Sequence, residues 1–164
     1  MNFARVIRHL AASDLTLRRA FPEVALRKIE QTIQQSERAR RGEICFALEA
    51  ALPFISLLRG QSGRERAIEV FSRLRVWDTE NNNGVLIYLL LADHDVEIVA
   101  DRGISSHVGD SQWEAICHEM ENAFRQNKFE DGVVKGIGRI AKLLSRYSTA
   151  EGRGNELFDR PIIL

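Results

Sequence analysis

An apolar run at residues 85–91, with the sequence VLIYLLL, constrains the fold more than any other feature of this 164-residue chain. The tetrapeptide NNNG precedes it at 81–84, and Asn and Gly readily adopt the positive φ of a tight turn. A polar tripeptide, DHD at 93–95, follows it, and residues 96–100 (VEIVA) alternate with the period of a β-strand. We therefore predict a buried strand at 85–91 that turns through 93–95 into a second strand at 96–100.

The rest of the chain predicts one more strand and a set of helices. Residues 43–51 (EICFALEAA) form a short, bounded apolar segment that is typical of a buried strand. Apolar side chains at helical spacing predict helices in five segments, residues 3–10, 22–38, 67–77, 111–124 and 130–147. Pro22 suits the first turn of a helix, and Ser111 and Glu114 have the spacing of a capping box. We also expect a short fourth strand within 102–109.

The order of these elements favours a single-domain α/β protein. The strand–helix–strand portion predicts a parallel βαβ crossover, and the β-hairpin adds an antiparallel strand, so the central sheet is mixed. Helices on both faces of this sheet make an α/β/α sandwich. Along the chain, we expect residues 1–20 to form an amphipathic helical extension, 21–150 the domain itself, and 151–164 an extended tail.

The composition excludes several classes of protein. Hydrophobic residues make up 45% of the chain, which is normal for a globular domain and too many for a disordered one. Basic and acidic residues each total 23, and the resulting net charge of zero argues against a nucleic-acid-binding protein. Cys45 and Cys117 form no CxxC motif and predict no disulfide. Charged residues interrupt the apolar start of the chain, so we expect a cytoplasmic protein without a signal peptide or membrane span.

Charge is spread unevenly along the chain. Residues 1–42 carry nine basic and four acidic side chains, whereas residues 77–131 carry three basic and twelve acidic ones. In the predicted sheet, the starts of two parallel strands and the end of the antiparallel strand meet at one edge. The acidic and amide side chains expected at this edge are Glu43, Asp78, Glu80, Asn83, Asp101 and Asp110. Carboxylates so close together repel one another unless a cation lies between them, and oxygen ligands suit Ca²⁺ or Mg²⁺.

Structural roles for the same residues stay open. Asp110 fits the cap of the helix that follows it, and Asp101 can pair with Arg102. The spacing from Asp78 does not make an EF-hand, because the twelfth position is Leu89 instead of a bidentate glutamate. The sequence thus predicts a cation at this edge and leaves the individual ligands unassigned.

The first predicted helix is amphipathic. Its apolar stripe consists of Phe3, Val6, Ile7 and Leu10. Arg5 and Arg8 lie on its other side. The stripe fits two roles, since it can pack against the domain or enter an anionic membrane surface. In the second role, we expect Arg5 and Arg8 to be partner-binding residues that contact lipid headgroups or a protein partner.

The stretch at 75–104, RVWDTENNNGVLIYLLLADHDVEIVADRGI, resembles the TPM domain family. The match includes the pattern WxxICxxM at 113–120 and FxxGxxxGIxxI at 129–140, and it spans residues 20–148. The ending NELFDRPIIL resembles that of a short bacterial subgroup. The resemblance implies an α/β/α sandwich that binds a divalent cation, often calcium, in loops at one sheet edge. The residues in the matching loops are Asp78, Glu80, Asn83 and Asp101.

The resemblance also implies two alternative functions. Relatives include acid phosphatases of the plant thylakoid lumen and photosystem II repair proteins, and many bacterial members carry a signal peptide and a membrane helix. This chain resembles a cytoplasmic member. The first implied function is a calcium-binding interaction or assembly module that works with membrane-associated protein partners. The alternative is a weak metal-dependent phosphatase, in which the cation polarises a phosphoryl oxygen. The sequence identifies no catalytic residue.

Overall fold

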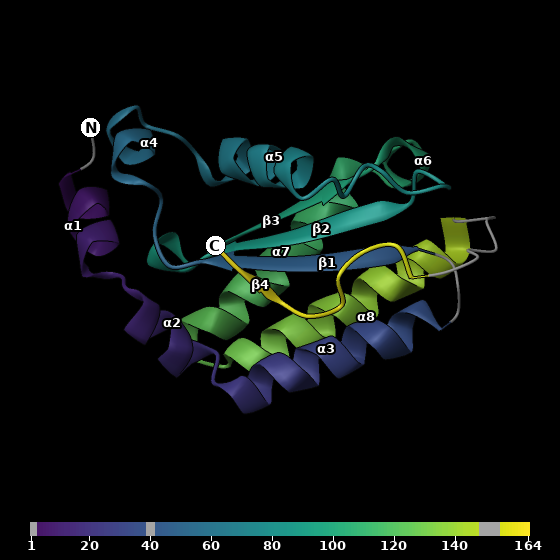
Figure 1. Cartoon of the computed structure of the whole chain (residues 1–164), viewed down its shortest axis with the longest axis horizontal. Helices are drawn as coiled ribbons and strands as arrows, with labels where there is room; N and C mark the ends of the chain where they lie inside the picture. The colour runs from purple at the N-terminus through teal and green to yellow at the C-terminus, as the bar shows by residue number, and fades with distance from the viewer. Residues whose placement is uncertain (1–2, 39–41, 148–154) are drawn as a thin grey trace.

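The computed structural model describes residues 3–38, 42–147 and 155–164. Within these residues, the centre of the molecule is a four-stranded mixed sheet with the order β3-β2-β1-β4 (Figure 1). The strands are β1 (Glu43–Glu49), β2 (Gly84–Leu90), β3 (Asp95–Ala100) and β4 (Ile162–Ile163). β1 is parallel to both β2 and β4, whereas β3 is antiparallel to β2. The predicted crossover and hairpin are therefore confirmed.

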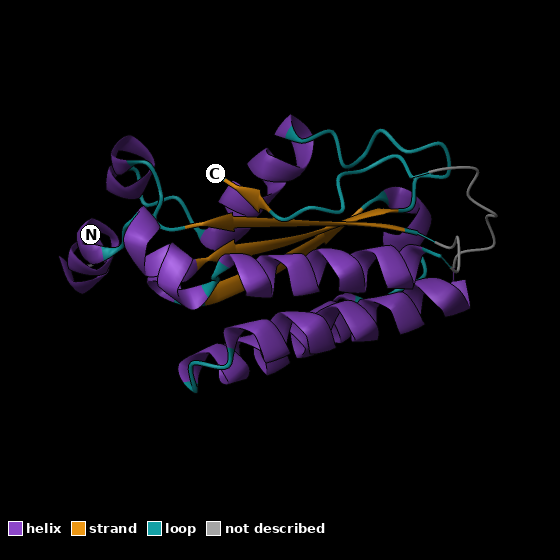
Figure 2. Ribbon diagram, turned by 60° about the horizontal axis from the view of Figure 1, so that its bottom comes forward, coloured by secondary structure: helices purple, strands orange, loops and turns teal. Residues whose placement is uncertain are grey.

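Helices cover both faces of this sheet. In the described part of the chain they are α1 (Phe3–Ala11), α2 (Asp14–Ala20), α3 (Glu23–Glu37), α4 (Phe54–Leu58), α5 (Gly63–Arg73), the 3-10 helix η1 (Leu91–Asp93), α6 (Arg102–Ser105), α7 (Asp110–Arg125) and α8 (Phe129–Tyr147). α3, α7 and α8 pack on one face, and α5 packs on the other (Figure 1). Figure 2 shows the strands between these helices. The predicted α/β/α sandwich is confirmed.

The two central strands are buried on both faces, which explains their nearly continuous apolar sequences. Every residue of β1 and of β2 is buried. Along β1, Phe46 and Leu48 pack toward α3, α7 and α8, while Cys45 and Ala47 pack toward α5. Cys45 and Cys117 are both buried and unpaired. The core therefore lies on both sides of the sheet.

Three local predictions are wrong. Residues 102–109 contain α6, and the fourth strand lies near the C-terminus as β4. α7 begins at Asp110 after the N-cap Gly109, so Ser111 lies inside the helix and makes no capping box. α5 begins four residues earlier than predicted, because Ser62 and Glu65 form the capping box there.

Both ends of the chain contribute to the domain. Leu17 of α2 and Phe21 after it are each 1% exposed and belong to the core. At the other end, β4 pairs with β1, and the Leu164 N–H donates to the Leu48 carbonyl oxygen at 3.0 Å. Residues 151–154 of the predicted tail lie outside the described residues. No helix within the described residues is long and apolar enough to span a bilayer.

α1 packs against the domain with its charged side. Arg5 Nε and Arg8 Nη2 contact the two oxygens of Asp93 at 2.8 and 3.0 Å. Phe3 and Leu10 remain 72% and 69% exposed. Of the predicted apolar stripe, Val6 packs against the core on the α5 side of the sheet, whereas Phe3, Ile7 and Leu10 remain exposed.

Candidate functional site

The sheet register brings predicted site residues to one edge. Glu43 pairs with Gly84 at the starts of β1 and β2, and β3 ends beside them. The Asp101 backbone N–H, just after β3, donates to the Gly84 carbonyl oxygen at 2.9 Å. We call this region the amino edge: the starts of β1 and β2, the residue Asp101, and the loop 78–83. Its backbone geometry matches the arrangement inferred from the predicted hairpin and crossover.

The loop 78–83 is held close to α6. The Asn83 N–H donates to Thr79 Oγ1 at 3.1 Å, and the Gly103 N–H donates to the Asn82 carbonyl oxygen at 3.0 Å. Asn82 has a φ of 50°, in the left-handed region that Asn tolerates. A Cβ at Gly103 would lie 2.5 Å from the Asn82 carbonyl oxygen and 2.9 Å from that of Asn81. Glycine at 103 therefore allows carbonyl oxygens of the loop to approach α6.

Two buried side-chain oxygens at the amino edge lack a partner. Asn83 is 3% exposed and Asp101 is 6% exposed. Within the residues that the structure describes, Asn83 Oδ1 and Asp101 Oδ2 accept no hydrogen bond. The other Asp101 oxygen, Oδ1, accepts the Arg102 N–H at 2.6 Å and caps α6. A buried oxygen without a hydrogen bond destabilises the folded state, and carboxylate and amide oxygens are ligands that hard cations accept.

The remaining predicted ligands are arranged differently. Glu43 Oε2 accepts the N–H groups of Glu156 and Leu157, both at 3.1 Å, and so anchors the C-terminal segment. Asp78 and Glu80 are exposed side chains of the loop. Asp110 lines a cavity beside β3. Across residues 3–38, 42–147 and 155–164, no three His, Cys, Asp or Glu side chains are grouped to hold a metal ion. In this structure the five predicted carboxylates do not form one group, and Asn83 and Asp101 are the core of the candidate site.

A carboxyl cluster that the sequence did not predict lies next to the amino edge. Glu37, at the end of α3, accepts the Ile44 N–H at 2.8 Å. Burial, aided by the nearby carboxylates of Glu43 and Asp159, raises the pKa of Glu37 from 4.5 to about 9. Burial also raises the pKa of Glu43, against the hydrogen bonds that it accepts. Glu37 and Glu43 therefore help to hold the C-terminal segment beside β1. Because the two glutamates are far from this segment in the sequence, the sequence pattern gave no sign of these contacts.

Two polar networks at the opposite edge of the sheet were also missed. Arg66 of α5 donates to both oxygens of Glu49 at 2.9 and 2.8 Å, and the Tyr88 hydroxyl donates to Glu49 Oε2 at 2.7 Å. Burial, followed by the Glu49 carboxylate, raises the pKa of Tyr88. All three residues are buried. The network joins α5 to the ends of β1 and β2, so we assign it a structural role.

The second network fixes α1. His9 is 4% exposed; its Nδ1 accepts the Leu52 N–H at 3.1 Å, which leaves Nε2 to donate to Asp93 Oδ2 at 3.1 Å. Burial tends to raise the pKa of Asp93, but hydrogen bonds from Arg5, Arg8 and His9 lower it below its ordinary value. Arg5 and Arg8, the predicted partner-binding residues, are therefore both bound to Asp93 in this structure.

The described residues thus form an α/β/α domain with two unpaired oxygens at the amino edge of its sheet. The family model of the TPM domain matches residues 19–143, and the chain belongs to this family. The match begins within α2 and ends within α8. It includes the loop 78–83 and Asp101.

Solved structures have the same fold. The BA42 protein of the psychrophilic bacterium Bizionia argentinensis is 27% identical, with a TM-score of 0.72 over 85% of this chain and 92% of that one. The N-terminal domain of a protein from P. gingivalis is 19% identical, with a TM-score of 0.58 over 76% and 79% of the two chains. The N-terminal domain of the cg2496 protein from Corynebacterium glutamicum is 11% identical, with a TM-score of 0.53 over 81% and 78%. No curated protein matches the chain.

Proposed function

We propose that this TPM domain binds a divalent cation, Ca²⁺ or Mg²⁺, at the amino edge. The observation that carries the proposal is the pair of buried, unpaired oxygens Asn83 Oδ1 and Asp101 Oδ2. Asp78 and Glu80 lie in the adjoining loop and can add carboxylate ligands when the loop moves, while loop carbonyl oxygens complete an oxygen-rich set. We favour Ca²⁺, because it accepts irregular geometry and backbone carbonyl ligands more readily than Mg²⁺.

In this proposal the domain is an interaction or assembly module that acts in the cytoplasm with a membrane-associated protein partner. Two buried, unpaired cysteines support a reducing compartment. The zero net charge supports a protein partner over a nucleic acid. Direct contact with an anionic membrane is the weaker alternative, because Arg5 and Arg8 already bind Asp93. Their role in partner binding stays a prediction.

Calcium is expected to raise the melting temperature of the chelator-treated protein. A ligand that binds the native state alone stabilises it by mass action, so the melting temperature should rise with each increase in calcium. Asp101→Asn should remove most of this rise, because it removes the ligand charge while asparagine still caps α6. Differential scanning fluorimetry with Ca²⁺ and Mg²⁺ measures both effects.

Glu119→Gln is the matched control, since it removes one charge from an exposed residue of α7 that pairs with Arg139. It should respond to calcium like the unchanged protein. If calcium raises the melting temperature of Asp101→Asn as much as that of the unchanged protein, the cation binds elsewhere and the proposal is wrong. The same samples also test the phosphatase alternative through p-nitrophenyl phosphate. Equal rates in the unchanged protein and Asp101→Asn are expected, whereas a calcium-dependent rate lost in Asp101→Asn would favour the enzyme.

A further inference from the structure

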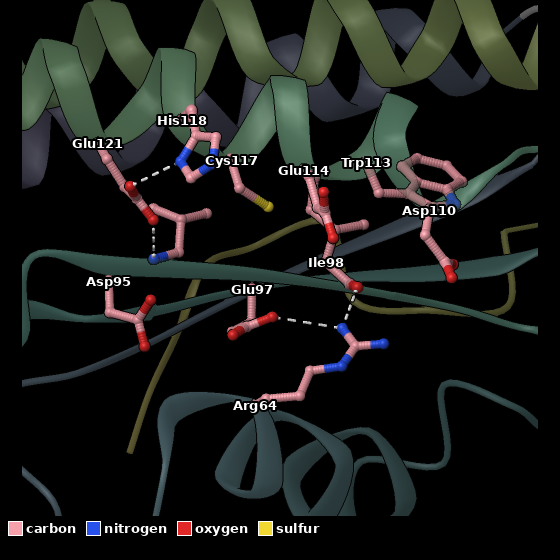
Figure 3. A pocket seen from close by; sticks show the side chains of 11 residues that line it. Arg64, Asp95, Glu97, Ile98, Asp110, Trp113, Glu114, Cys117, His118 and Glu121 are labelled. Carbon is pink, nitrogen blue, oxygen red and sulfur yellow. Dashed lines mark hydrogen bonds and ion pairs between the residues drawn. The ribbon is translucent and has the colours of Figure 1, made fainter.

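A cavity of about 440 Å³ follows the outer side of β3 (Figure 3), and neither Asn83 nor Asp101 is among the residues that line it. β3 is at one end of the strand order, so its outer backbone groups have no neighbouring strand within the described sheet. Asp95 and Glu97 of β3 lie on the α5 side of the cavity, and side chains of α7 lie on the other side (Figure 3). The cavity therefore lies along a sheet edge that has no neighbouring strand, and such an edge can accept an added strand.

The walls of this cavity are strongly acidic. The carboxylates that line it are Asp95, Glu97, Asp110, Glu114 and Glu121. The basic side chains facing them are Arg64 and His118. Burial, followed by the charges of Glu121 and Asp93, raises the pKa of Asp95. Negative charge in excess of positive charge, partly shielded from water, favours a cationic occupant.

Side chains already occupy the outer hydrogen-bonding groups of β3. Arg64 Nη1 donates to the Ile98 carbonyl oxygen at 2.6 Å, and Glu121 Oε1 accepts the Val96 N–H at 3.5 Å. These contacts are at alternate residues of β3, the spacing at which an added strand would make its own hydrogen bonds. The Arg64 side chain is 51% exposed and can leave the Ile98 carbonyl oxygen freely. Glu121 is 13% exposed and the buried Cys117 thiol contacts the Ile98 N–H, so an added strand must also turn these two side chains of α7 away from β3.

The wall of the same cavity contains a buried donor without an acceptor. Trp113 lines the cavity and is 7% exposed, and its Nε1 has no hydrogen-bond partner among the described residues. Figure 3 shows the nitrogen side of its ring turned toward Asp110. An N–H group requires an oxygen acceptor, which a metal ion or a polyamine does not provide and a peptide carbonyl does. The occupant thus combines positive charge with carbonyl oxygens.

We propose that β3 binds an extended peptide segment of a partner protein that carries lysine or arginine at alternate positions. The segment adds a strand to β3, replaces Arg64 and Glu121 at the strand edge, and accepts the Trp113 N–H through a main-chain carbonyl. Its basic side chains contact the carboxylates on the cavity walls. This interaction surface is independent of the cation at the amino edge. It predicts that the partner protein of the module contributes an extended, basic segment.

Binding can be tested with the full-length ¹⁵N-labelled chain in a buffer that contains a chelator. The probe is the acetylated, amidated peptide Lys-Val-Lys-Val-Lys, and the controls are Glu-Val-Glu-Val-Glu and spermidine. We expect the lysine peptide to shift the Trp113 indole signal and the amides of Val96 and Ile98, with Trp113→Phe assigning the indole. The glutamate peptide should cause no shift. Spermidine should bind more weakly and leave the Trp113 indole unchanged.

Two variants of α7 make the test specific to the cavity. Glu114→Gln should weaken binding of the lysine peptide about threefold to fivefold, as expected for the loss of one partly exposed charge contact. Glu119→Gln removes the same charge from a residue of α7 that is not in the cavity lining and should leave binding unchanged. The proposal is overturned by any of three results: no binding of the lysine peptide, an unshifted Trp113 indole at saturation, or equal binding of spermidine with the same indole shift.

Discussion

Replacing Arg66 with methionine is expected to lower the free energy of unfolding by about 3–5 kcal/mol, the usual cost of leaving one partner of a buried ion pair alone. Arg66 and Glu49 are both 5% exposed, and Arg66 donates two hydrogen bonds to the Glu49 carboxylate. Without Arg66, the Tyr88 hydroxyl would be the remaining described donor to that carboxylate. Urea unfolding followed by circular dichroism measures the loss.

The double variant Glu49→Gln/Arg66→Met should recover most of this stability. Glutamine carries no charge and keeps an oxygen that can accept the Tyr88 hydroxyl. Arg73→Met is the control, because Arg73 is an exposed arginine of the same helix and should change stability by less than about 0.5 kcal/mol. A loss in Arg66→Met no greater than in Arg73→Met would show that the network contributes little.

Raising the pH from 5 to 9 is expected to destabilise the protein through Glu37, and Glu37→Gln should remove this part of the decline. The pKa of Glu37 is about 9 in the folded protein and near 4.5 when the side chain is free in water. Between these values the folded state holds a proton that the unfolded state has lost, so rising pH favours unfolding. The stabilisation is complete below pH 4.5 and is lost as the pH rises through about 9.

Glutamine at position 37 resembles the protonated glutamate, since its oxygen can accept the Ile44 N–H and its amide can donate to Asp159. Urea unfolding at pH 5, 7 and 9 should show Glu37→Gln more stable than the unchanged protein at pH 9 and similar to it at pH 5. Glu30→Gln, on the same helix, should keep the original pH dependence. Identical slopes in all three proteins would contradict the assignment.

The fold was largely predictable because its central strands carry unambiguous signals. The run at 85–91 is buried on both faces. The short polar segment DHD that follows it predicts a turn into an antiparallel neighbouring strand, and β3 is that strand. β4 was not predictable, since a two-residue strand has no period and forms through pairing with β1. The start of α7 was mistaken because Ser111 and Glu114 fit a capping box, while the chain enters the helix two residues earlier, at Gly109.

The candidate site was predictable in its backbone and less so in its side chains. Strand register follows from topology, so Glu43 and Asp101 could be placed at one edge from the sequence. The direction of each carboxylate depends on partners far away in the chain. The Glu43 side chain accepts hydrogen bonds from the N–H groups of Glu156 and Leu157. The hydrophobic periodicity of the sequence cannot predict that contact. The position of α1 depends on a distant partner in the same way, because Arg5 and Arg8 bind Asp93, which lies far away in the sequence.

Terbium luminescence can detect a hard cation at the amino edge and locate it relative to the two tryptophans. Tb³⁺ takes oxygen ligands as Ca²⁺ does, and a nearby excited tryptophan sensitises its emission. Trp77 adjoins the loop 78–83, whereas Trp113 lines the acidic cavity beside β3. We predict sensitised emission that calcium displaces, that Trp77→Phe abolishes and that Trp113→Phe leaves intact. Emission that persists in Trp77→Phe and disappears in Trp113→Phe would place the ion in the cavity beside β3 and would overturn the proposed site at the amino edge.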